Sequence, residues 1–266
     1  MYKYLQVFLV SIKQEFAYKL SFIMWRVRNV IQVLIAYFLW SSIFSDSGRT
    51  LFGYDEASII TYVFSLIIVR AFVLSARAVD VAGEVSRGDL SNYLVKPVNY
   101  FRYWLTRDIS SKALNLSFAL VEMGILYLIL KPSLYFQTNP LLILAFFISL
   151  FSAMFIYFTL LFIASAVPFW QPQQAWGAHF ILIIIVDFLS GGLFPLDVLP
   201  SYITKVLSLT PFPYLIFYPI QVYLGKVSML EIVRGFTITA FWMFVLVFIM
   251  NTVWRKGLKV YQAYGK

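Results

Sequence analysis

The sequence contains no cysteine and a single histidine, His179, among its 266 residues. The lack of cysteine excludes disulfides and thiolate metal sites, and one histidine is too few for a His-rich metal centre. Charged residues make up only 12% of the chain, with no Ser-His-Asp arrangement, no H-E-x-x-H motif and no carboxylate cluster among them. These absences argue against an enzyme.

A phosphate-binding loop is also missing. Gly225-Lys226 is followed by valine and lacks the upstream glycine of the G-x-x-x-x-G-K-[ST] motif. We therefore expect this chain to bind no ATP and no other cofactor. The net charge of +9 comes from basic residues that flank apolar runs. Because no soluble basic domain carries them, nucleic acid is not expected as a partner.

Apolar residues are abundant, at 61% of the chain, and aromatic residues reach 20%. This composition is typical of polytopic membrane proteins and predicts an all-α fold with one transmembrane domain over residues 1–266. Each predicted span must cross roughly 30 Å of hydrocarbon. The six apolar stretches are Val30–Phe44 (extended backward by Phe22–Trp25), Ala57–Ala76, Ala113–Leu130, Leu141–Val167, Ala178–Phe194 and Gly235–Trp254.

The basic residues are distributed unevenly between the two sides of these spans. Fifteen of the 21 Lys and Arg residues lie in the N-terminal segment, the insert between spans two and three, and the C-terminal tail. Five, including Arg49, lie in the opposite connections, and Arg70 lies within a span. The positive-inside rule therefore predicts that both termini and the insert are cytoplasmic.

Two segments do not fit the pattern of simple spans. Residues 1–21 place Lys3 and Lys13 on one helical arc and Phe8 and Ile12 elsewhere, which predicts an interfacial helix; a cytoplasmic extension of span one is the alternative. Residues 191–230 are broken too often by proline to span, and predict an outer re-entrant or interfacial hairpin, with a simple loop as the alternative. Its prolines are Pro195, Pro200, Pro211, Pro213 and Pro219.

The polar insert, residues 77–112, carries a candidate docking helix. Asp89 is the predicted N-cap and Lys96-Pro97 the predicted stop. An apolar face flanked by charges suits docking to a cytoplasmic partner, and a surface turn with an ordinary packing face is the alternative. The predicted face consists of Leu90, Tyr93 and Leu94, and the flanking charges are Glu84, Arg87 and Lys96.

Three ionisable residues, Arg70, Glu122 and Asp187, lie within predicted spans. Each costs roughly 2.5–3.5 kcal/mol on insertion scales, so each is a candidate for a transport pathway or for intramembrane pairing. An Arg70–Glu122 pair, or snorkelling of Arg70, would be purely structural. His179, at the start of span five beside Trp176, is predicted to be interfacial.

The same three residues would be the coupling groups of an ion- or proton-coupled secondary transporter. Such a transporter would show inverted repeats with matching broken helices, but the proline-rich hairpin before span six has no counterpart before span three. A membrane scaffold or lipid-modifying enzyme is the remaining alternative, and no catalytic constellation favours it.

Three motifs, in this order and with this topology, resemble the permease subunits of bacterial type-2 ATP-binding-cassette (ABC) exporters, over essentially the whole chain. The resemblance is greatest to the ABC-2 family transporter branch that includes viologen- and daunorubicin-exporter-like permeases. The motifs are Gly88-Asp-Leu90…Leu94-Val-Lys96-Pro97, Gly191-Gly-Leu-Phe-Pro195-Leu-Asp-Val-Leu-Pro200 with Pro211-x-Pro213-Tyr, and Gly257-Leu-Lys-Val-Tyr261-Gln-Ala-Tyr-Gly265.

The resemblance implies that residues Glu84–Val98 form a coupling helix that grips a separate nucleotide-binding subunit, where ATP and Mg would bind. It implies a dimeric permease in the bacterial cytoplasmic membrane, and favours a heterodimer while leaving a homodimer open. The implied cargo is a hydrophobic or amphiphilic drug, lipid or glycolipid. The implied coupling residues are Glu84, Arg87, Asp89, Leu90, Tyr93, Leu94 and Lys96.

Overall fold

The computed structural model describes residues 2–17, 19–44 and 50–261, and these residues are all-α, as predicted. Arg49 and the end of the C-terminal motif, residues 262–265, lie outside the described residues. Six helical stretches are long and apolar enough to cross a membrane, which confirms the predicted number of spans. They are Phe22–Ile43, Glu56–Ser86, Tyr100–Leu130, Pro140–Phe169, Pro172–Leu189 and Met229–Val260.

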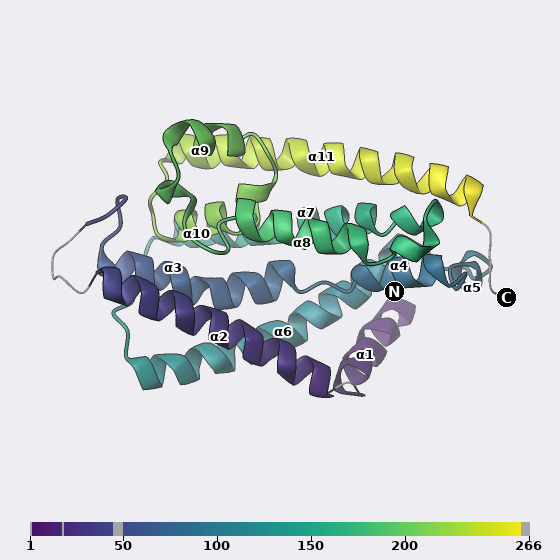
Figure 1. Cartoon of the computed structure of the whole chain (residues 1–266), viewed down its shortest axis with the longest axis horizontal. Coiled ribbons are helices and arrows are strands. Elements are labelled where there is room, and N and C mark those ends of the chain that lie inside the picture. The colour runs from purple at the N-terminus through teal and green to yellow at the C-terminus, as the bar shows by residue number, and fades with distance from the viewer. Residues whose placement is uncertain (1, 18, 45–49, 262–266) are drawn as a thin grey trace.

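The long helices run side by side in an elongated bundle (Figure 1). The α-helices are α1 (Tyr2–Ala17), α2 (Lys19–Ile43), α3 (Glu56–Val69), α4 (Val79–Ser86), α5 (Ser91–Leu94), α6 (Tyr100–Leu130), α7 (Pro140–Ala164), α8 (Gly177–Leu189), α9 (Ser201–Leu207), α10 (Phe217–Tyr223) and α11 (Met229–Val260). Helices α4 and α5 lie at one end of the bundle, which we call the insert end. Helices α9 and α10 lie at the other, the hairpin end.

Helix α3 lies in the interior of the bundle, and nine of its residues, from Ile59 to Val69, are buried. It contacts α2 and α6, while α7 packs against α10 and α11. By contrast, α2 exposes a line of apolar side chains that includes Ile31, Ile35 and Phe38. An exposed apolar surface of this extent matches contact with lipid hydrocarbon, so the chain is a multi-pass membrane protein.

Span two is interrupted near the insert end. After α3 the chain forms a π-helical turn, η1 (Arg70–Leu74), and Ser75 is extended at ψ 112° before helix resumes at Val79. Such turns release backbone carbonyls from their normal helical partners. The buried Lys112 ammonium of α6 donates hydrogen bonds to the carbonyl oxygens of Val73, at 2.9 Å, and Ser75, and so satisfies two of them.

The third span starts earlier than its apolar stretch predicted. Helix α6 begins at Tyr100, where the Asn99 side chain accepts the backbone N–H of Arg102, at 2.9 Å, as an N-cap. The second half of the polar insert is therefore the first part of α6. Four polar side chains of this part, Asp108, Ser110, Ser111 and Lys112, are buried because they face α1 and the break in span two rather than water.

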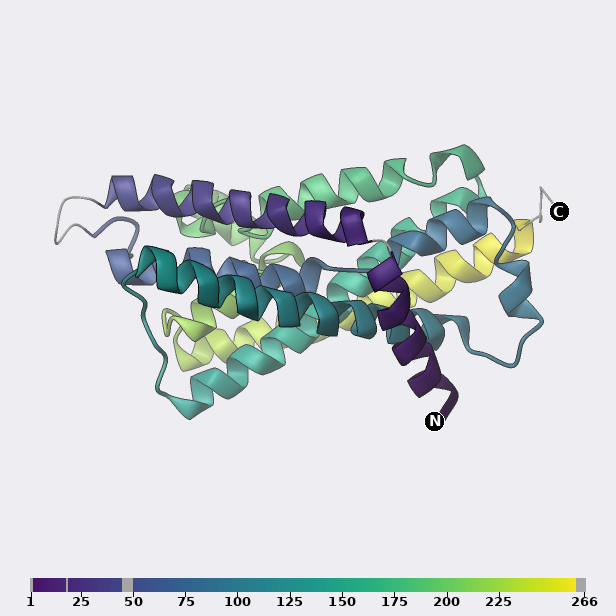
Figure 2. The same cartoon turned by 90° about the horizontal axis from the view of Figure 1, so that it is seen from below.

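Helix α1 runs in a different direction from α2 and packs across α6 (Figure 2). Its contact with α6 includes a hydrogen bond of 2.9 Å from the Ser110 hydroxyl to the carbonyl oxygen of Phe8. Leu5 and Leu9 point away from the bundle and are more than half exposed. Its interfacial position in the bilayer stays a prediction.

The proline-rich segment, residues 191–230, forms short helices that are too short to span, as predicted. Helices α9 and α10 have seven residues each. Helix α10 packs on α7, and Tyr218 and Val222 of α10 join Ala145 in a small second core. Whether the segment is re-entrant stays a prediction.

Candidate functional site

The first part of the polar insert folds into α4, a turn and the single-turn helix α5. Asp89 does not cap α5: the N-cap position is Leu90, without a side-chain hydrogen bond. The Asp89 carboxylate pairs instead with Arg87, at 3.1 Å from Nε to Oδ2. Gly88 takes a positive φ of 78°, and this turn moves the start of the helix past Asp89.

The docking face predicted for this helix is only partly at the surface. Leu90 is completely buried in the main core, whereas Leu94 is 52% exposed and Val95 is 85% exposed. Leu90 therefore cannot belong to a contact surface in this conformation. Its burial follows from the turn, which folds the start of α5 back against α4, with a 3.3 Å bond from Leu90 N–H to the Glu84 carbonyl. The exposed apolar surface is Leu94-Val95.

Glu84 of α4 holds the insert together. Its carboxylate accepts hydrogen bonds from the Tyr93 hydroxyl at 3.0 Å, the Tyr100 hydroxyl at 2.7 Å and the Trp104 indole at 3.3 Å. These donors come from α5 and from the start of α6, so one carboxylate joins three helices. Burial, together with the neighbouring Tyr103 and Glu84, raises the pKa of Tyr93, which therefore stays a neutral donor at physiological pH.

A hollow opens beside this carboxylate at the insert end. Most of the predicted coupling residues line it, with the exception of Leu90 and Leu94. The lining residues are Glu84, Arg87, Asp89, Asn92, Tyr93, Val95 and Lys96. The fold therefore gathers predicted polar residues around one surface depression, which Val95 also lines, and exposed Leu94 precedes Val95 in the chain.

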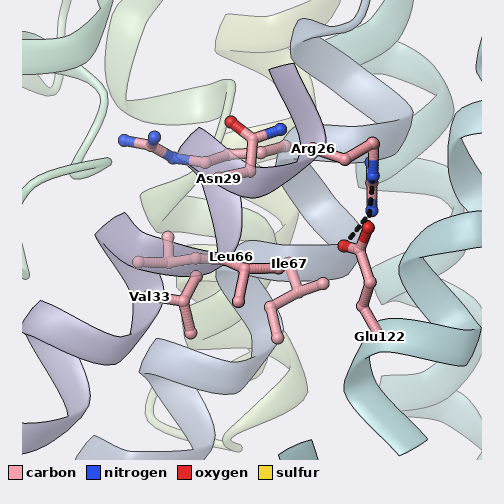
Figure 3. Close-up of a pocket in the computed structure, with 8 residues that line it drawn as sticks. Arg26, Asn29, Val33, Leu66, Ile67 and Glu122 are labelled. Atoms are coloured by element: carbon pink, nitrogen blue, oxygen red, sulfur yellow. Dashed lines mark hydrogen bonds and ion pairs between the residues drawn. The ribbon is translucent and has the colours of Figure 1, made fainter. Parts of the chain in front are cut away.

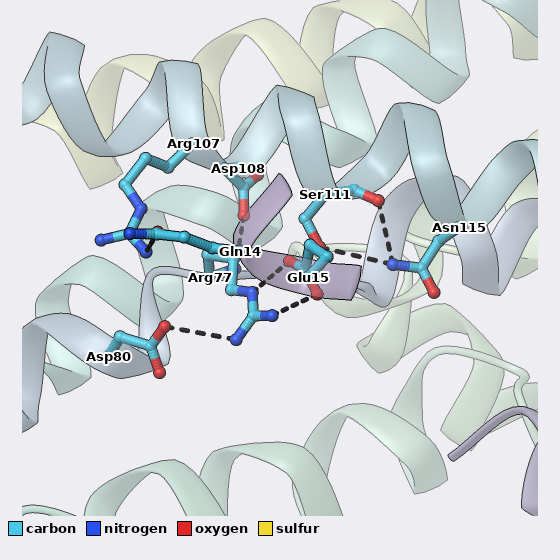
Figure 4. Close-up of polar contacts among 8 residues, drawn as sticks. All are labelled: Gln14, Glu15, Arg77, Asp80, Arg107, Asp108, Ser111 and Asn115. Carbon is cyan, nitrogen blue, oxygen red and sulfur yellow. Dashed lines mark hydrogen bonds and ion pairs between the residues drawn. The ribbon is translucent and has the colours of Figure 1, made fainter. Parts of the chain in front are cut away.

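A second polar cluster joins α1, α6 and the break in span two (Figure 4). The Arg77 guanidinium forms an ion pair with Glu15 of α1, and the Arg77 backbone N–H donates to Asp108 of α6 at 2.8 Å. Arg107 donates to Gln14 of α1 at 3.1 Å. The polar insert is thus fastened to the N-terminal helix by side-chain contacts from both of its halves.

The three intramembrane charges are all paired within the fold. Glu122 of α6 pairs with Arg26 of α2, through Nε at 2.6 Å and through Nη2 (Figure 3). Arg70 pairs instead with Asp187 of α8, at 3.3 Å. The Arg70–Glu122 pair, one of the structural alternatives, does not form. Glu122 has as its partner Arg26, which the sequence places among the charges flanking span one.

Arg70 has further partners. Its guanidinium donates to the Gln32 side chain of α2 at 3.0 Å and to the carbonyl oxygen of Gly192 at 2.8 Å. Arg70 and Glu122 nevertheless line the same narrow crevice between α2, α3 and α6. The residues around it are Arg26, Asn29, Val30, Val33, Leu66, Ile67, Arg70 and Glu122.

His179 is completely buried within the protein, and its predicted position at the depth of the membrane interface stays a prediction. Its Nε2 lies 3.0 Å from the Ser165 hydroxyl and its Nδ1 lies 3.1 Å from the carbonyl oxygen of Ala175. Within the part of the chain that the structure describes, no group of three or more His, Asp or Glu side chains is placed to hold a metal ion.

The arrangement is that of a membrane domain with internally paired charges and a folded polar insert at one end. No curated protein is similar enough to count as a match. The sequence model of the ABC-2 family transporter proteins matches residues 30–265, which is most of the chain. The chain therefore belongs to the ABC-2 family of transporter proteins.

Proposed function

We propose that this chain is the permease subunit of an ATP-driven exporter, which moves a hydrophobic or amphiphilic drug, lipid or glycolipid out of the cytoplasm or the inner leaflet. Membership of the ABC-2 family supports the general part of this proposal, a membrane permease of an ABC transporter. The resemblance implies a position in the bacterial cytoplasmic membrane, and the charge bias of the sequence supports a cytoplasmic location of both termini.

The observation that carries the proposal is the exposed Leu94-Val95 pair beside the hollow at the insert end. Unlike the exposed apolar residues of α2, this pair belongs to the polar insert, outside the six apolar helices. Apolar side chains exposed next to charged residues, away from the bilayer, are typical of a protein contact surface. The partner would be the nucleotide-binding subunit, which would bind ATP and Mg.

The internal bonding of the insert supports a role in transmitting force. Glu84 ties α4, α5 and α6 together, so a partner that moves Leu94-Val95 would move these helices as one unit.

The permease would work with a second permease chain, and the resemblance favours a heterodimer over a homodimer.

The proposal is tested by co-purification of the detergent-solubilised permease with its ATPase and by ATP-dependent transport in proteoliposomes. We expect Leu94→Asp and Val95→Asp each to weaken association by about tenfold or more, because each places a charge in the interface. Val206→Asp is the matched control, since Val206 is 66% exposed on α9 at the other end of the bundle. Unchanged association and transport in both insert variants would refute the proposed docking surface.

A further inference from the structure

Span two and the residue Tyr54 just before it are bonded to the proline-rich segment at three positions, each eight residues from the next. The Tyr54 hydroxyl, just before α3, donates to Asp197 at 2.7 Å. The Tyr62 hydroxyl donates to the carbonyl oxygen of Gly191 at 2.7 Å. Eight residues are a little more than two helical turns, which places Tyr62 and Arg70 about 80° apart around the span. Both side chains nevertheless reach the backbone of residues 191–192. We call the three bonds made by Tyr54, Tyr62 and Arg70 the clasp.

The clasp gives a physical reason for the Gly191-Gly192 pair. A Cβ at Gly191 would lie 2.7 Å from the Tyr62 hydroxyl, and a Cβ at Gly192 would lie 2.8 Å from Arg70 Nη2. Gly191 also has a φ of 86°, which other residues rarely adopt. The two glycines therefore allow the backbone of the proline-rich segment to approach the side chains of span two.

Arg70 has a special place within the clasp, since it is the first residue of the π-helical turn η1. Its guanidinium joins span two to α2 through Gln32, to α8 through Asp187 and to the proline-rich segment through Gly192. On the other side of η1 the span unwinds and continues directly into α4 of the polar insert.

The two ends of the molecule are thus connected by one element. Helix α4 carries Glu84 and borders the hollow at the insert end, and α3 carries Tyr62 at the clasp. A helix is stiff along its axis, whereas a π-helical turn and an extended residue are places where its direction can change. The break is held by Lys112 of α6, which is bonded to the carbonyl oxygens of Val73 and Ser75. Because the chain runs without interruption from α4 through this break to η1, a displacement of α4 would reach the clasp as a change in the direction of the span.

We propose that α3 and η1 transmit the movement of the polar insert to the proline-rich segment, and that Arg70 is the positioning residue that fastens the two. This inference rests on the proposed function, because it needs a partner that moves the insert. Tyr62, Gly191 and Gly192 belong to the same connection between span two and the proline-rich segment. The clasp would make the proline-rich segment move together with span two during each cycle of ATP hydrolysis.

The test uses the full transporter complex in proteoliposomes. Because the chain has no cysteine, a single Tyr202→Cys on the exposed surface of α9 carries a fluorescent label that reports on the proline-rich segment. The signal is recorded with and without ATP, together with transport and ATP hydrolysis. Arg70→Lys keeps the charge opposite Asp187 but loses the fork that serves several acceptors at once.

We expect Arg70→Lys and Tyr62→Phe each to reduce the ATP-dependent change of the label, and the transport per ATP hydrolysed, by about fivefold, the effect of one lost hydrogen bond. Association with the ATPase should not change. Tyr218→Phe is the matched control, since Tyr218 is also buried and donates to a backbone carbonyl, that of Ile232, at 3.0 Å. It should leave the ATP-dependent change intact.

The inference is overturned if Tyr62→Phe and Arg70→Lys assemble normally and keep the full label response and the full transport per ATP. It is also overturned if Tyr218→Phe lowers both to the same extent, since the effect would then reflect general loosening. Failure of the proposed function is a different result: the unmodified chain itself would show no ATP-dependent transport, whatever the state of the clasp.

Discussion

The Arg26–Glu122 ion pair provides the sharpest test of the intramembrane packing. It joins α2 to α6 through two nitrogen atoms of the guanidinium, Nε and Nη2, and the two side chains are only 7% and 17% exposed. Glu122→Gln removes the negative charge but keeps the size of the side chain. The guanidinium of Arg26 is then left buried opposite a neutral amide, which satisfies fewer of its donors.

The expected loss in the free energy of unfolding follows from the burial of Arg26, the partner that remains. Breaking a buried ion pair by removing one partner costs about 3–5 kcal/mol, and the remaining amide oxygen puts Glu122→Gln at the lower end, about 3 kcal/mol. In a chain of this size each kcal/mol corresponds to a shift of roughly 2–4 °C in the midpoint of unfolding. We therefore expect a fall of roughly 6–12 °C, larger than for any exposed pair.

The assay is thermal unfolding in a fixed detergent, followed by tryptophan fluorescence, on a double-mutant cycle. Arg26→Gln alone should also destabilise the protein, whereas the Arg26→Gln/Glu122→Gln double variant should recover about 2–3 kcal/mol of the summed losses. Arg87→Gln is the control, because the Arg87–Asp89 pair is 66% and 36% exposed and should contribute less than about 1 kcal/mol. Additive losses across the cycle would show that the two residues act independently and would refute the reasoning.

Two further predictions concern the hairpin end. Asp55→Ala should cost about 1 kcal/mol, because the Asp55 carboxylate caps α3 through the Ser58 N–H at 3.2 Å, and Asp55→Asn should lose much less. The same bond lowers the pKa of Asp55, so its contribution is present at neutral pH and is lost as the pH falls through that lowered pKa, which thermal unfolding from pH 7 to pH 3 would detect. Gly191→Ala should destabilise more than Gly53→Ala in the same assay. Both have positive φ, but only a Cβ at Gly191 meets other atoms, so equal effects would contradict the close approach of Tyr62.

The number of spans could be predicted from the sequence because a bilayer requires some twenty consecutive apolar residues, and this requirement is local. The start of span three could not. Residues 100–112 include Asp108 and Lys112, which composition alone assigns to a polar loop. In the fold these side chains are buried and bonded to the break in span two and to each other. Their partners in span two are distant in sequence, so the local pattern of the chain contains no sign of those bonds.

The docking face shows a second kind of limit. Helical spacing grouped Leu90 with Leu94, but α5 has a single turn, and the preceding turn at Gly88 carries Leu90 into the core. The intramembrane charges show the same limit: sequence identified Arg70, Glu122 and Asp187 as residues that need partners, but not which helices are neighbours. The local pattern identifies residues whose burial costs free energy, whereas the tertiary fold determines which partners offset that cost.

The contacts of α1 bear on how the insert can move. Glu15 of α1 pairs with Arg77, and Lys3 donates to the carbonyl oxygen of Pro97 at 2.9 Å, so α1 contacts the insert both at the break in span two and beyond α5. A partner that displaces the insert must either carry α1 with it or break these bonds. Because the Glu15 side chain is only 9% exposed, separating it from Arg77 would leave a buried carboxylate without its cation, which is costly. The lower-energy movement is therefore one in which α1, the insert and the Tyr100 end of α6 shift together, and span two changes direction at residues 75–78, where it is already unwound.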